Sequence, residues 1–130
     1  MAVLTDLSLL EAADALRAGK VSSTELTRAC LDRIQAVDGE VRAFLTVTED
    51  LALAQAEAAD QQLATRPDEP LPLVHGIPIA VKDVLCVEGV PTTCGSKILE
   101  DFRPPYTATS VSRLVEAGAD GLVLFNRFYQ

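Results

Sequence analysis

Hydrophobic positions recur at helical spacing through the first half of the chain, and two of the repeats begin with a helix-start signal. Ser8 is followed three residues later by Glu11, and Ser22 by Glu25. This spacing is typical of a capping box, in which the two side chains bind the first free N–H groups of a helix. Together with Ala-rich composition, the pattern predicts three helices, over residues 9–18, 23–37 and 48–64.

Runs that favour strands fall between and after these helices. Residues 42–47 combine aromatic and β-branched side chains and predict a strand, while apolar runs predict largely buried strands over 77–82 and 122–125. Scattered Gly and Pro make 86–108 an irregular connection, and a fourth helix is expected to follow it as far as Gly118. Prolines make 65–73 a loop. This alternation of helices and strands predicts an α/β fold.

Composition narrows the classes of function. The 130 residues carry a net charge of −8, which disfavours a nucleic-acid surface or binding to anionic lipid. Three cysteines make no even disulfide framework, and no signal peptide or apolar run of about 18 residues is visible. We therefore expect a cytoplasmic protein in a reducing environment.

Lys82 is the residue most suggestive of chemistry, because it stands at the end of an apolar, strand-like run. One interpretation is a lysine at a strand end with its amine in water. The other is a buried lysine that loses its proton and acts as a base, which burial favours by penalising the charged form. Lysine paired with serine is a known alternative to the Ser-His-Asp triad. The residue alone leaves both interpretations open.

Other polar residues near Lys82 in the sequence are weaker candidates for a site. The small residues of 92–96 suit either a turn-rich connection or a loop lining a site beside Lys82. Cys86, Cys94 and His75 lack the close spacing of metal ligands, so we expect no metal site here. The two cysteines are expected to be packed as apolar groups, and the histidine to be a loop residue before the strand.

Residues 76–83, Gly-Ile-Pro-Ile-Ala-Val-Lys-Asp, resemble the lysine strand of the amidase signature family. Further segments carry the same resemblance, at residues 22–26, 89–90, 92–99, 104–109 and 114–119. Within the family they are most similar to the A subunits of aspartyl/glutamyl-tRNA amidotransferases. The similarity covers residues 3–119 and is too long and specific for coincidence.

The resemblance implies a fold and an organisation. We expect the N-terminal part of an amidase-signature fold, with helices packed on an incomplete mixed sheet, forming one partial amidase domain over residues 1–130. Within it, residues 1–64 are expected to be mainly helical, residues 73–119 to hold the lysine strand and the following signature region, and residues 120–130 to form a divergent tail.

The resemblance also implies chemistry. In that family one serine attacks a carboxamide carbon, a second serine on a cis peptide relays the proton, and a lysine, matched here by Lys82, is the base. Glutamine is deamidated, and the ammonia passes to the B subunit, where ATP and Mg²⁺ activate misacylated glutamyl- or aspartyl-tRNA. The C subunit holds the A and B subunits together. No cofactor is expected in this chain, and tRNA is reached only through the complex.

The end of the chain departs from this pattern. After the Ala-Gly-Ala turn the family continues differently, and neither catalytic serine has a counterpart, because Ser96 and Ser110 do not sit in the required motif. We therefore expect a truncated chain that is inactive alone. Two alternatives stay open: a short non-catalytic paralogue that docks on the other amidotransferase subunits, or a fragment of a general carboxamide amidase.

Overall fold

The computed structural model describes residues 3–65, 70–119 and 122–125. Within them, the helices are α1 (Leu9–Arg17), α2 (Ser23–Val41), α3 (Glu49–Thr65) and α4 (Thr109–Glu116), and the strands are β1 (Ile79–Lys82) and β2 (Leu122–Phe125). Two single turns of 3₁₀ helix, η1 (Leu4–Asp6) and η2 (Lys97–Leu99), complete the regular structure. The helices and strands alternate along the chain, which confirms the α/β prediction.

The two strands pair in parallel and form the sheet of the described residues. Ile79 lies opposite Leu122, and Lys82 opposite Phe125. Because parallel strands cannot be joined by a tight turn, the chain crosses between them through an irregular segment and α4. An isolated antiparallel bridge joins His75 to Ala119 just outside the strands.

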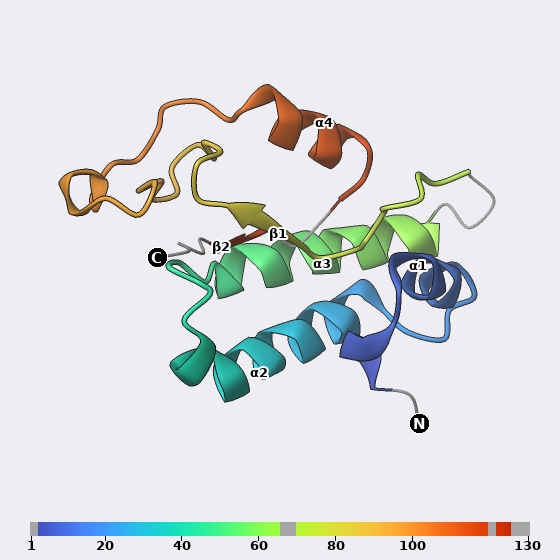
Figure 1. Ribbon diagram of the computed structural model, residues 1–130. Coiled ribbons are helices and arrows are strands. Elements are labelled where there is room, and N and C mark those ends of the chain that lie inside the picture. Colours follow the sequence, from blue (N-terminus) through green and yellow to red (C-terminus); the bar gives the residue numbers. More distant parts are fainter. Residues whose placement is uncertain (1–2, 66–69, 120–121, 126–130) are drawn as a thin grey trace.

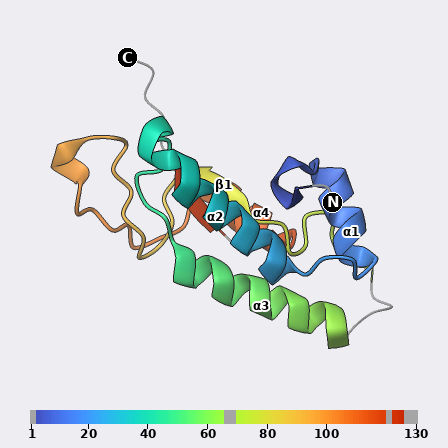
Figure 2. The ribbon, with the colours of Figure 1, turned by 90° about the horizontal axis from the view of Figure 1, so that it is seen from below.

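Helices cover both sides of this strand pair. Figure 1 shows α3 below the strands and α4 above them, and in Figure 2 α2 lies on the same side as α3. Val81 of β1 and Val111 of α4 belong to one buried cluster with Val87 and Val90. The irregular connection between β1 and α4 extends away from the helices (Figure 1).

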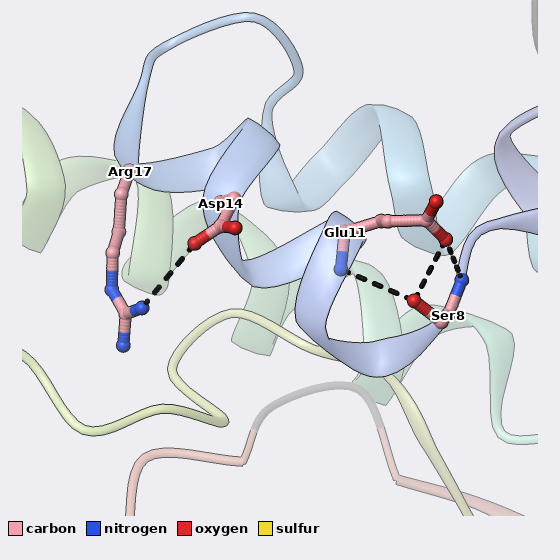
Figure 3. Close-up of polar contacts among 4 residues, drawn as sticks. All are labelled: Ser8, Glu11, Asp14 and Arg17. Atoms are coloured by element: carbon pink, nitrogen blue, oxygen red, sulfur yellow. Dashed lines mark hydrogen bonds and ion pairs between the residues drawn. The ribbon is translucent and has the colours of Figure 1, made fainter.

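Local capping explains where α1 and α2 begin. In α1, the Ser8 hydroxyl accepts a hydrogen bond from the Glu11 amide at 3.3 Å, and a Glu11 carboxylate oxygen accepts one from the Ser8 amide at 2.8 Å (Figure 3). Ser22 and Glu25 form the same reciprocal pair at the start of α2. These contacts satisfy N–H groups that have no partner inside the helix, so both predicted starts are confirmed.

The predicted strand over residues 42–47 is wrong. This run contains no strand and instead connects α2 to α3. α2 continues past the predicted end at residue 37 to Val41, and the Asp38 carboxylate then accepts hydrogen bonds from the amides of Ala43 (2.7 Å) and Phe44 (3.3 Å). Phe44 packs against the buried cluster between α2 and α3. The apolar residues of this run therefore anchor a helix connection rather than a sheet.

Smaller differences concern the ends of elements and the burial of β1. The strand begins at Ile79 rather than at residue 77, and Val81 is its one buried residue, so it is less buried than predicted. Part of the predicted 65–73 loop, residues 66–69, and part of the predicted tail, residues 120–121 and 126–130, lie outside the described residues.

None of the helices in the described part of the chain is long and apolar enough to cross a membrane.

Candidate functional site

Lys82 is the last residue of β1, and its side chain is exposed. The strand stops there because the chain turns, with the Leu85 amide donating a hydrogen bond to the Lys82 carbonyl at 2.9 Å. Val81 takes the buried side of the strand, so Lys82 emerges on the other side. Among the described residues the Lys82 side chain is thus exposed, as the first of its two interpretations expects, and its role as a base stays a prediction.

Asp83, the next residue, is buried with only 2% of its surface exposed. Its carboxylate accepts a hydrogen bond from the Thr93 amide at 2.8 Å and another from the Thr93 hydroxyl. Its carbonyl accepts a third from the Cys94 amide at 2.9 Å. These bonds bring the 92–96 loop to the end of the strand that carries Lys82, which favours the interpretation of this loop as part of a site.

The 92–96 loop is a tight turn whose shape is set by its own hydrogen bonds. The Thr93 hydroxyl accepts from the Gly95 amide at 2.9 Å, and the Thr93 carbonyl from the Ser96 amide at 2.8 Å. Cys94 takes a left-handed backbone conformation, with φ of 49°, which is uncommon for a residue other than glycine. Cys94 is exposed, so the prediction that it packs as an apolar group is wrong.

A cavity of about 280 Å³ lies beside this loop, between it and the connection from α2 to α3. Thr46, Thr93, Ser96, Lys97 and Glu100 line it together with Leu45, Pro91 and Gly95. The recess therefore combines a mainly apolar surface with a few polar and charged residues.

Ser96 and Ser110 both lie at the start of a helix. The Ser96 hydroxyl accepts from the Ile98 amide at 3.2 Å and so caps η2. Ser110 lies exposed in the first turn of α4. Among the described residues, neither serine is hydrogen-bonded to Lys82.

The remaining candidates have structural contacts. His75 lies before β1, outside the named helices and strands, and is buried, with its Nε2 3.4 Å from the Ala59 carbonyl of α3. Cys86 is half-buried, with its Sγ 3.6 Å from the Tyr106 hydroxyl, and this contact raises the pKa of Tyr106. Across the described ranges, no three His, Cys, Asp or Glu side chains gather as metal ligands would.

Asp83 is an anchor that the sequence pattern did not predict. In the sequence it stands only as a charge beside Lys82, while in the structure its carboxylate is held by a threonine ten residues further along. An aspartate that directly follows a strand and precedes a Gly- and Thr-containing run is a weak signal for such a contact, since aspartates of this kind also cap turns locally.

Comparison with known sequences gives a consistent result. The family model described as Amidase matches residues 25–126. Over 119 residues the chain is 52% identical to the A subunit of glutamyl-tRNA(Gln) amidotransferase from Chloroflexus aurantiacus, covering 92% of this chain and 24% of that protein. The corresponding protein of Geobacter metallireducens is 51% identical, with 89% of this chain and 23% of that protein covered.

Solved structures show the same arrangement. An amidase family protein from Bacillus anthracis superposes with a TM-score of 0.84 at 29% identity, covering 95% of this chain and 24% of that one. The peptide amidase of Stenotrophomonas maltophilia gives a TM-score of 0.80 at 32% identity, with 94% and 24% covered. The chain spans about a quarter of the length of the curated relatives it matches.

Proposed function

The chain belongs to the amidase family, and from this premise we propose that it supplies the lysine-bearing N-terminal part of an amidase active site. Lys82 is the base of a Ser-cisSer-Lys set, and the 92–96 loop forms the wall beside it. The two serines of the set have no counterpart in residues 1–130. This stretch alone therefore does not hydrolyse amides, because a base without its nucleophile cannot form an acyl-enzyme.

The substrate we propose is glutamine. Relatives that are about half identical to this chain are named as the A subunit of glutamyl-tRNA(Gln) amidotransferase, whereas the peptide amidase shares 32% identity. A serine oxygen attacks the side-chain carboxamide carbon of glutamine, the C–N bond breaks, and ammonia leaves with the proton that the relay returns. Water then releases glutamate from the acyl-enzyme.

The ammonia is used by a partner. We propose that the protein works with the B and C subunits of the amidotransferase in the cytoplasm, where the B subunit holds ATP and Mg²⁺ and amidates misacylated glutamyl- or aspartyl-tRNA. In this proposal the chain itself binds neither ATP nor Mg²⁺. Its net charge of −8 supports contact with tRNA through the complex rather than directly.

The observation that carries the proposal is the place of Lys82. It stands at the carboxyl end of a parallel strand, next to a loop that the buried Asp83 holds in place. In open α/β sheets, binding sites lie at the carboxyl ends of the strands. The side chain is exposed here, and a lysine must be desolvated to act as a base at neutral pH. The proposal thus requires further residues of the assembled enzyme to cover it.

The test is ammonia release from glutamine by the gene product that carries this sequence, assembled with its partner subunits. We expect Lys82→Ala to lower kcat by at least about 10²-fold, the lower range for loss of a general base. Lys20→Ala, at an exposed lysine after α1, is the matched control and leaves activity unchanged.

Two outcomes contradict the proposal. Full activity of Lys82→Ala would remove Lys82 from the chemistry. Lys82-dependent glutamine hydrolysis by residues 1–130 alone would show that this stretch already contains a complete site. A peptide amide assayed in parallel with glutamine checks the substrate, because a general amidase would prefer the peptide amide.

A further inference from the structure

The Asp83 carboxylate is buried directly after Lys82, and burial of a charge is costly unless strong hydrogen bonds compensate for it. Thr93 provides such bonds, because its amide donates to one carboxylate oxygen and its hydroxyl to the other. Hydrogen bonds to an ionised group are shorter and stronger than those between neutral groups. The pair thus fixes two chain segments that are ten residues apart.

The consequences for Lys82 follow from the neighbouring backbone. The Cys94 amide adds a bond to the Asp83 carbonyl at 2.9 Å, and the Leu85 amide bonds the Lys82 carbonyl at 2.9 Å. The turn that ends β1 is therefore held at two successive carbonyls, those of Lys82 and Asp83. The hydroxyl of Thr93 also orients the loop itself, through the Gly95 amide at 2.9 Å.

We propose that Asp83 and Thr93 form a positioning clamp that sets the direction of Lys82 relative to the 92–96 loop during amide hydrolysis. The inference rests on the proposed function, because it assigns the pair a role in orienting the base of that site. Both residues act through Lys82 and the loop, without contacting the reacting atoms. Small misplacements of a catalytic group cost large factors in rate, so the clamp has a measurable effect on kcat.

Thr93→Val tests the clamp with little change in side-chain size. It removes the hydroxyl bond to Asp83 and keeps the amide bond. In the assembled amidotransferase we expect kcat for glutamine hydrolysis to fall by about 10- to 100-fold, with KM changed less than about threefold. Thr93→Ser restores the hydroxyl, so we expect it to recover most of kcat.

Thr107→Val is the matched control, since the Thr107 hydroxyl also bridges distant parts of the same irregular segment, accepting from the Glu88 amide at 3.0 Å. We expect it to leave kcat within about twofold, because this bond involves neither Asp83 nor the 92–96 loop. Thermal melts of all variants check that each is folded. Asp83→Asn is a second variant that retains the shape of the side chain while removing its charge, and we expect it to lower kcat as Thr93→Val does.

The outcomes separate this inference from the proposed function. If Lys82→Ala abolishes activity while Thr93→Val has normal kcat, the clamp is overturned and the function stands. Equal losses in Thr93→Val and Thr107→Val, or no recovery in Thr93→Ser, would mean that the bond only orders the loop and would also overturn the clamp. If Lys82→Ala retains activity or the unchanged assembly is inactive, the proposed function fails, and the clamp fails with it.

Discussion

The helical layer of α1–α3 and the irregular segment between β1 and α4 are held by contacts of different range. The caps of α1 and α2 join residues only three positions apart. The irregular segment also relies on bonds between residues ten or more positions apart, such as Thr93 to Asp83, Arg103 to the Gly89 carbonyl and the Glu88 amide to Thr107. Local signals can specify the first region, while the second depends on individual distant partners.

Gly118→Ala is expected to be the most damaging change, because Gly118 packs closely against His75, a residue distant from it in the sequence. Gly118 has a φ of 85°, and an added Cβ would lie 3.2 Å from the backbone Cα of His75. A left-handed alanine costs about 1–2 kcal/mol, and displacing the backbone of a buried neighbour adds to that. We expect the free energy of unfolding to fall by about 3 kcal/mol, measured by chemical denaturation.

Gly19→Ala is the control for this change. Gly19 also has a positive φ, of 62°, but nothing lies within 4 Å of an added Cβ. We expect a loss of only about 1 kcal/mol, from the backbone conformation alone. Equal losses at the two glycines would show that the close approach between Gly118 and His75 carries no extra cost.

Asp60→Ala tests the helical layer instead of the irregular segment. It removes a contact between residues of α3 and α2 that are far apart in the sequence. From α3, the Asp60 carboxylate accepts bonds from the Ser23 amide (2.7 Å), the Thr24 amide (3.0 Å) and the Thr24 hydroxyl (2.7 Å). Its loss leaves the start of α2 with unpaired N–H groups. We expect a destabilisation of about 2 kcal/mol in denaturant titrations.

The neighbouring substitution Gln61→Ala gives the reference for Asp60→Ala. Gln61 is exposed on the same helix, so we expect its change to stay within about 0.5 kcal/mol. A comparably small effect of Asp60→Ala would mean that α2 relies on its local capping box alone, and the helical layer would then be purely local in origin.

Thr27→Val should stabilise the protein. Thr27 in α2 is 1% exposed, and its hydroxyl oxygen has no hydrogen-bond partner among the described residues. Valine has the same shape and removes the cost of burying an unpaired hydroxyl, so we expect a gain of about 1 kcal/mol in the free energy of unfolding. Thr24→Val, which loses the hydroxyl bond to Asp60, should destabilise instead. A loss in both variants would contradict this account.

The helical layer was largely predictable because its information is local. The capping residues indicated the starts of α1 and α2 correctly. The end of α2 was missed because Asp38 and the following glycine suggested a stop, whereas Asp38 lies inside the helix and caps the chain beyond it. The run at 42–47 was misassigned because aromatic and β-branched residues favour strands only when a partner strand is available.

The candidate site was only partly predictable, because its contacts depend on the tertiary fold. The strand-end position of Lys82 followed from the apolar run before it. The exposure of its side chain did not follow from the sequence, because burial depends on what packs against each face of the strand. The clamp between Asp83 and Thr93 could not be found from spacing, because no periodic pattern relates two residues on either side of an irregular loop.

Glu11→Gln gives the smallest expected effect and tests the local character of α1. The hydrogen bonds from the Ser8 hydroxyl and amide lower the pKa of Glu11 below its ordinary value of 4.5. The unfolded chain therefore binds this proton at a higher pH than the folded protein does. The stabilisation is fully present above pH 4.5 and is lost as the pH falls through the lower, folded value.

Glutamine also serves in a capping box but does not titrate. Denaturation of both proteins between pH 3 and 6 should thus show a shallower acid dependence for Glu11→Gln, and identical slopes would mean that the ionised Glu11 carboxylate adds no stability to the folded protein.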